Sequence, residues 1–291
     1  MGDAARALRE GVDLGVAAAV LAAALLHATW HALVKSSGDR VVALAGMSLV
    51  SGALAFAALP FVAIPRAGVL AVIAFSVLLH IGYKLALAHL YEKADLSRAY
   101  PLARGITPVL AAALGFVFLS EKPSGTTLAG VLAISVGIVG LLFERGGNRL
   151  SAGAAGAAAA AGAAVAAYSV LDAYGVRLNG DWLSFTAWLV ACDSGLFVGY
   201  ALASRGRAAT AAWRGEWGRT LASGLLGSIA FCVFLWALGR AEVGPVSALR
   251  ETSMAFSALI GAVVLKERMS RARALAVAMV LGGTAAIALA R

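Results

Sequence analysis

The sequence has 291 residues, of which 61% are hydrophobic and 13% are charged, with a formal net charge of +9. Soluble domains have about half apolar and a quarter charged residues, so this chain has too few charges to cover a water-facing surface. Its Lys and Arg residues lie between apolar runs and form no basic stripe with interleaved aromatics, which excludes a nucleic-acid partner.

Ten apolar runs follow one another along the chain, each bounded by charges or by Gly and Pro. A crossing of the hydrocarbon core needs about 20 residues per helix, so these runs leave no length for a sizeable soluble domain. Their continuous apolarity lacks the alternation of barrel strands and predicts helices. The runs lie at residues 14–34, 41–63, 68–90, 98–119, 125–143, 152–174, 182–203, 219–239, 246–265 and 272–290.

The first run follows basic residues, as a signal peptide would. It is long for a signal peptide and carries His27, Trp30 and His31, so we expect an uncleaved first helix. The predicted fold class is therefore an all-α integral membrane protein of about ten transmembrane helices, with the lipid bilayer as its surroundings.

An internal repeat relates the two halves of the chain. A spacing of 146 residues, held by polar and glycine positions, predicts two five-helix repeats over residues 1–147 and 148–291. Because five is odd, the second repeat enters the membrane inverted relative to the first, an architecture that recurs in secondary transporters. The matched pairs are Arg104 with Arg250, Gly115 with Gly261, Glu121 with Glu267, Ser124 with Ser270, and Gly137 with Gly283.

Several short motifs also occur in a characteristic order. They are HATWH at residues 27–31 followed by Lys35, ADLSRAYP at 94–101, EKPS at 121–124 and KERMS at 266–270. In this order and spacing the chain resembles the ten-helix members of the drug/metabolite transporter superfamily, which carry tandem EamA-type repeats. The resemblance implies a basket of ten helices that carries small metabolites, and bacterial members include exporters of amino acids.

The third run places three polar side chains on one helical face, because His80, Tyr83 and Lys84 follow the spacing i, i+3 and i+4. An ionisable side chain at membrane depth costs about 2.5–3.5 kcal/mol, so this face is predicted to line a cavity. Lys84 would suit the carboxylate of an amino-acid-like substrate. The alternative is an ion pair with Asp172 or Asp193 that only ties helices together.

A second group of candidates begins the fourth and ninth runs. Tyr100 and Arg104 lie one turn apart, and Arg250 with Glu251 holds the corresponding place in the second half. Arginine binds carboxylates bidentately, which favours a substrate site. The alternative is that both arginines extend to the membrane surface.

Aromatic residues supply the remaining candidates, namely His27, Trp30, Tyr168 and Trp236. They would form cavity walls, with ordinary helix packing as the alternative. His27 and His31 lie one turn apart, but no other ligand motif supports a metal site. Neither a metal nor a cofactor is predicted, and the chain lacks the GxxxxGK[ST] motif of ATP hydrolysis.

These features together predict a secondary carrier of the bacterial inner membrane that exports neutral or aromatic amino acids by alternating access. Proton coupling and facilitated diffusion both stay open. An integral-membrane enzyme acting on lipids, or a channel, is the alternative. The positive charges of the loops favour placing both termini outside the cytoplasm. The small-residue spacing of Gly195 and Gly199 allows close approach of helices, so both a monomer and a homodimer stay open.

Overall fold

The computed structural model describes residues 12–35, 39–93, 96–143, 151–263 and 269–290. The first half contains α2 (Leu14–Lys35), α3 (Arg40–Ala58), α4 (Ala67–Lys93), α5 (Leu96–Leu119) and α6 (Gly125–Gly140). The second half contains α7 (Ala152–Asn179), α8 (Trp182–Arg205), α9 (Arg207–Gly215), α10 (Trp217–Leu238), α11 (Val243–Glu251), α12 (Ser253–Val263) and α13 (Arg271–Leu289).

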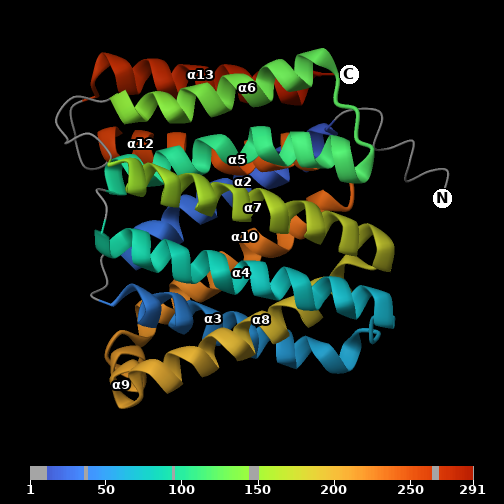
Figure 1. Cartoon of the computed structure of the whole chain (residues 1–291), viewed down its shortest axis with the longest axis vertical. Helices are drawn as coiled ribbons and strands as arrows, with labels where there is room; N and C mark the ends of the chain where they lie inside the picture. The colour runs from blue at the N-terminus through green and yellow to red at the C-terminus, as the bar shows by residue number, and fades with distance from the viewer. Residues whose placement is uncertain (1–11, 36–38, 94–95, 144–150, 264–268, 291) are drawn as a thin grey trace.

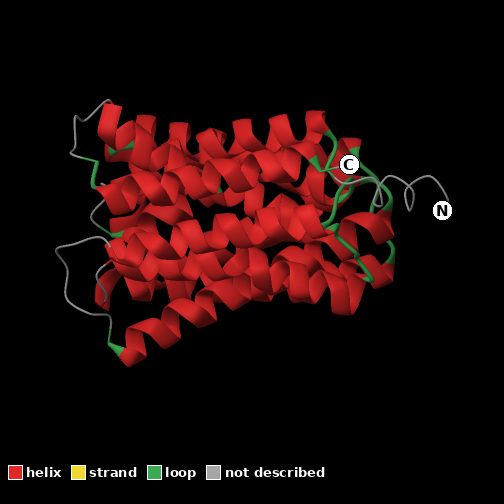
Figure 2. Ribbon diagram, turned by 90° about the horizontal axis from the view of Figure 1, so that it is seen from above, coloured by secondary structure: helices red, strands yellow, loops and turns green. Residues whose placement is uncertain are grey.

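The long helices lie side by side as one bundle (Figures 1 and 2). No strand occurs in the ranges that the structure describes, which confirms the all-α fold class. Among these residues, eight helices are long and apolar enough to cross a membrane, and Gly125–Gly140 is a shorter apolar helix. The start of α2 and the end of α13 lie on the same side of the bundle (Figure 1).

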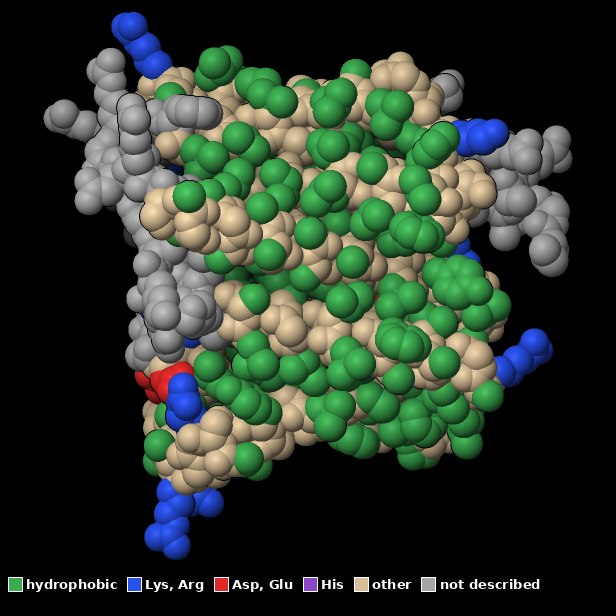
Figure 3. All heavy atoms as spheres, viewed as in Figure 1, with side chains coloured by type: hydrophobic (Ala, Val, Ile, Leu, Met, Phe, Trp, Pro, Cys, Tyr) green, Lys and Arg blue, Asp and Glu red, His purple; other side chains and the backbone are tan. Residues whose placement is uncertain are grey.

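Large apolar side chains cover the outside of the bundle. Phe75, Phe116 and Leu132 are 65%, 61% and 51% exposed. Exposure of such large apolar side chains is unfavourable in water but favourable against lipid tails. Figure 3 shows hydrophobic side chains across the middle of one face, with Lys and Arg gathered towards its edges. This distribution is typical of a multi-pass membrane protein whose ends reach the headgroups.

The helix starts carry ordinary capping signals. Ser124 accepts a hydrogen bond from the Thr127 amide at the start of α6, and Ser270 accepts one from the Arg273 amide at the start of α13. Such caps satisfy amides that would otherwise lack partners at a helix end. The two serines are one of the pairs separated by 146 residues, and they perform the same local task.

The contact between α6 and α13 is reciprocal. A Cβ on Gly137 of α6 would lie 2.9 Å from the carbonyl oxygen of Ala276, and one on Gly283 of α13 would lie 2.6 Å from that of Gly130. The same spacing of 146 residues relates Gly130 to Ala276 and Gly137 to Gly283. Small residues let these two backbones approach closely.

The other helix contacts follow a matching pattern. Helix α3 packs against α8, and α6 packs against α13. The contact of α4 with α7 has a counterpart in that of α10 with α2, and the contact of α5 with α7 has one in those of α11 and α12 with α2. Each long helix of one half therefore contacts the other half.

Two elements differ from the sequence prediction. The predicted run 246–265 is not one helix, because α11 ends at Glu251 and α12 begins at Ser253. The segment between α8 and α10 contains the short helix α9, whose Trp213 is buried and donates a hydrogen bond of 2.8 Å to the carbonyl oxygen of Val42. The predicted repeat boundary at 147/148, residues 94–95 of the ADLSRAYP motif and residues 266–268 of the KERMS motif lie outside the described residues.

Candidate functional site

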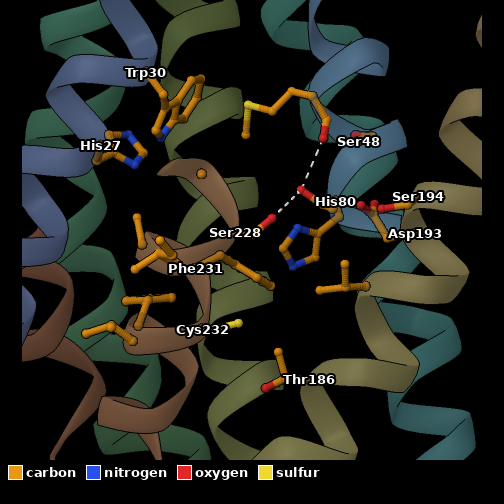
Figure 4. A pocket seen from close by; sticks show the side chains of 18 of the residues that line it. His27, Trp30, Ser48, His80, Thr186, Asp193, Ser194, Ser228, Phe231 and Cys232 are labelled. Carbon is orange, nitrogen blue, oxygen red and sulfur yellow. Dashed lines mark hydrogen bonds between the residues drawn. The ribbon is translucent and has the colours of Figure 1, made fainter. Parts of the chain in front are cut away.

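A cavity of about 480 Å³ lies inside the bundle and is lined from both halves of the chain. Figure 4 shows His27 and Trp30 on one side of it, Asp193 and Ser194 on the other, and Ser228 and Phe231 between them. The lining is mostly apolar with a few polar groups, as is usual for small-molecule sites. Seven of the nine predicted site residues line it, namely His27, Trp30, His80, Tyr83, Lys84, Arg104 and Tyr168.

His80 joins α4 to α7. Its Nε2 lies 3.0 Å from Oδ2 of Asp172, a carboxylate that is completely buried. Ser76 donates a hydrogen bond to the other oxygen, Oδ1, of the same carboxylate. The ring of Tyr168 stacks on His80 with centroids 4.0 Å apart. These contacts fix the imidazole in one orientation at the cavity wall.

Lys84 joins α4 to α8. Its Nζ lies 2.5 Å from Oδ2 of Asp193 and 3.3 Å from Oγ of Ser48, and it lies 4.8 Å from the centre of the Phe197 ring. The pairing that sequence reasoning held as an alternative is thus present, with Asp193 as the partner. Lys84 still lines the cavity, but its charge already has a counter-ion.

Arg104, on α5, and Arg250, on α11, share one acid. Nε of Arg104 lies 2.7 Å from Oε2 of Glu251, and Nε of Arg250 lies 3.5 Å from Oε1 of the same carboxylate. Arg104 is 2% exposed, Arg250 is 8% exposed and Glu251 is fully buried. Both arginines line the cavity. The alternative that they extend to the membrane surface is therefore wrong.

The aromatic wall on α2 contacts α5. The rings of His27 and Trp30 meet edge to face with centroids 4.8 Å apart, and an Nη of Arg104 lies 3.5 Å from Nε2 of His27. Tyr100 does not line the cavity. Its hydroxyl lies 2.7 Å from Nε2 of His31. Because His31 lines the cavity, Tyr100 contacts a residue of the cavity wall without lining the cavity itself.

Trp236 is placed differently from the prediction. It lies outside the cavity lining, packs against the hydrophobic core and holds the Arg240 guanidinium 4.5 Å from its ring centre. The residues of α10 that line the cavity span positions 227–234, one turn and more before the end of the helix. The sequence placed Trp236 within an apolar run but did not show on which face of the helix it lies.

Small polar residues of α3 and α10 were missed by sequence reasoning. Ser48 and Ser51 line the cavity from α3, and Ser228 on α10 donates a hydrogen bond of 2.8 Å to Ser51 (Figure 4). The spacing i, i+3 of two serines in an apolar run was a signal for this face. Within the described ranges, no three His, Cys, Asp or Glu residues cluster as metal ligands would.

Beyond the cavity, two loops from different halves interlock at one end of the bundle. Glu121 accepts a hydrogen bond of 2.9 Å from the amide of Val243, and Glu242 accepts one of 2.9 Å from the amide of Lys122. Arg177 at the end of α7 lies 2.8 Å from Glu121 and also donates to the carbonyl oxygens of residues 238 and 241. We call these residues the end lock.

The end lock is expected to weaken as the pH rises. Burial, followed by the nearby carboxylate of Glu121, raises the pKa of Glu242 from 4.5 to about 7. A folded state that holds the proton more tightly than the unfolded state loses stability between these two pKa values as the pH increases. Titration of Glu242 should therefore lower the free energy of unfolding between about pH 4.5 and about pH 7.

The variant Glu242→Gln should remove this pH dependence while keeping an oxygen for the Lys122 amide. Thermal unfolding of purified protein between pH 4 and pH 8 measures the effect. Glu216→Gln is the matched control, because Glu216 forms an exposed pair with Arg219. A pH profile that Glu242→Gln leaves unchanged would contradict the raised pKa.

Comparisons with known proteins agree with the architecture. Residues 153–289 match the EamA-like transporter family. A solved crystal structure of a protein superimposes with a TM-score of 0.77 at 20% identity, covering 94% of this chain and 98% of that chain, and so shows the same fold. The comparison with curated proteins finds no match. The second half of the chain is thus similar to a transporter family, which supports a membrane transporter of small molecules.

Proposed function

We propose that this chain is a secondary carrier of the bacterial inner membrane that exports neutral or aromatic amino acids by alternating access. The observation that carries the proposal is the cavity of about 480 Å³, which is lined from both halves and has charged groups set in an apolar wall. A volume of this size suits one small metabolite. Aromatic rings from α2, α4 and α7 would accommodate an aromatic or apolar side chain.

The polar contacts beside the cavity support a substrate site that lies between the two halves. His80 with Asp172, Lys84 with Asp193, and Arg104 with Glu251 each join a helix of the first half to one of the second. The reciprocal contact of α6 with α13 supports two inverted repeats, with the substrate site between them.

The end lock supports a closed state at one end of the bundle. It joins the connection before α6 to the connection before α11, which belong to different halves. In an alternating-access cycle these hydrogen bonds would form when this end closes and separate when it opens.

Transport by purified protein tests the proposal. In liposomes loaded with unlabelled phenylalanine, labelled phenylalanine should accumulate by counterflow and saturate with concentration. Counterflow distinguishes a carrier from a channel, because a channel does not couple efflux to uptake. Absence of counterflow for every neutral and aromatic amino acid in a panel would reject the proposed function.

Two substitutions connect this transport to the cavity. Tyr83→Ala and Lys84→Ala should each lower uptake at least about tenfold, because they remove a wall and a charge at the site. Tyr174→Ala and Arg66→Ala are matched controls, since Tyr174 is 45% exposed and Arg66 is exposed in the connection before α4. Wild-type uptake by both cavity variants, with folding verified by thermal unfolding, would reject the cavity assignment.

A further inference from the structure

The charges around the cavity are not evenly matched. Lys84 has its own acid, Asp193, and Nε2 of His80 contacts Asp172. Arg104 and Arg250 instead share the single carboxylate of Glu251. This cluster of three therefore carries one excess positive charge, and it is enclosed almost completely by protein.

Arg250 is the less well partnered of the two arginines. Its contact with Glu251 is 3.5 Å long, whereas that of Arg104 is 2.7 Å. Its Nη2 atom is buried and has no hydrogen-bond partner among the residues that the structure describes. Guanidinium groups have five N–H donors, and a buried donor without a partner costs about 1–3 kcal/mol. A group that supplies an acceptor there would remove this cost.

The Arg250 side chain is also held in place for binding. Its guanidinium lies 4.0 Å from the centre of the Phe234 ring, which restricts its movement. It lines the same cavity as His27, Trp30 and Tyr83. A planar fork of donors in a fixed orientation matches the two oxygens of a carboxylate.

We infer that Arg250 is the receptor for a carboxylate group of the transported substrate, with Glu251 and Phe234 as its positioning residues. This inference rests on the proposed function and narrows it to carboxylic acids, including zwitterionic amino acids. Amines and amides of the same shape are rejected, because they leave the excess charge without a counter-ion. The role first expected of Lys84 thus belongs to Arg250, since Lys84 is already neutralised by Asp193.

Competition with analogues that differ only at the carboxyl end tests the inference. Counterflow of labelled phenylalanine is measured against unlabelled phenylalanine, 3-phenylpropionate, phenylalaninamide and phenylethylamine. The first two carry the carboxylate and should compete. The last two lack it and should compete about a hundredfold less well, the size of effect expected when a buried charge pair loses one partner.

The variant Arg250→Gln should remove this discrimination. It leaves Arg104 and Glu251 as a one-to-one pair, so the protein should fold and melt at or above the wild-type temperature. Uptake of phenylalanine should fall about a hundredfold, and Arg250→Lys should restore only part of it because an ammonium has no planar fork. Arg240→Gln is the matched control, since Arg240 also stacks on an aromatic ring but lies outside the cavity.

The outcomes separate the inference from the proposed function. If wild-type protein transports phenylalanine and phenylalaninamide competes equally well, the carboxylate receptor is wrong while the carrier stands. If Arg250→Gln folds and keeps the wild-type preference for carboxylates, the inference is also overturned. If no compound of either kind is transported, the proposed function itself fails.

Discussion

Glu251→Gln is expected to lower the free energy of unfolding by about 3–5 kcal/mol, the range found when one partner of a buried ion pair is removed. Glu251 is fully buried and is the shared counter-ion of Arg104 and Arg250. The substitution leaves two positive charges facing each other in a low-dielectric interior. Thermal unfolding and the yield of folded protein in detergent measure the loss.

Two further variants test the reason for that loss. Adding Arg250→Gln to Glu251→Gln should recover part of the stability, because it removes one of the two like charges. Arg205→Gln should change stability by no more than about 1 kcal/mol, since its ion pair with Asp39 is exposed. Equal stability of Glu251→Gln and Arg205→Gln would show that the buried cluster does not depend on this carboxylate.

Gly283→Val is expected to separate α6 from α13. A Cβ at this position would lie 2.6 Å from the carbonyl oxygen of Gly130 and 2.8 Å from a side-chain carbon of Ile134. The oxygen belongs to a helix backbone, so it moves only if α6 moves. Overpacking of this kind costs about 1–3 kcal/mol or more, which should appear as a lower melting temperature.

The neighbouring residue supplies the control for this prediction. A Cβ on Gly282 would meet nothing within 4 Å. Gly282→Val therefore adds the same side chain, one residue away, against open space. If the two variants melt at the same temperature, close approach of the two backbones is not what the glycine provides.

The helix positions could be predicted from the sequence because their start and stop signals are local. The predicted runs 152–174 and 182–203 correspond to α7 and α8, which begin after the capping residues Ser151 and Asp181. Gly180 ends α7 in the left-handed region with φ of 75°, a conformation that glycine adopts without strain. Such features depend on a few adjacent residues.

The partners of the charged residues could not be predicted in this way. His80 and Lys84 share one face of α4, yet His80 pairs with Asp172 on α7 and Lys84 pairs with Asp193 on α8. Helical spacing shows that both side chains lie on the same inward face of α4. It does not show which neighbouring helix lies opposite each of them. That choice depends on how the helices cross, which is a property of the whole bundle.

The break in the ninth run had no clear sequence signal either. Arg250, Glu251 and Thr252 occupy the junction of α11 and α12, and all three are buried. Thr252 turns its hydroxyl back to the carbonyl oxygen of Leu249 at 2.7 Å, which satisfies one of the acceptors at the end of α11. The number of apolar residues in the run does not reveal a break between two helices that depends on such contacts.

The ion pairs between the halves have a consequence for synthesis of the protein. In the pairs beside the cavity, the first half supplies His80, Lys84 and Arg104, and the second half supplies the acids. The first half enters the bilayer before those acids have been translated, so its Lys84 and Arg104 begin without their counter-ions, at about 2.5–3.5 kcal/mol each. Arrival of the second half removes that cost, because it supplies Asp193 and Glu251. The charge pattern therefore favours the second half as the partner of the first.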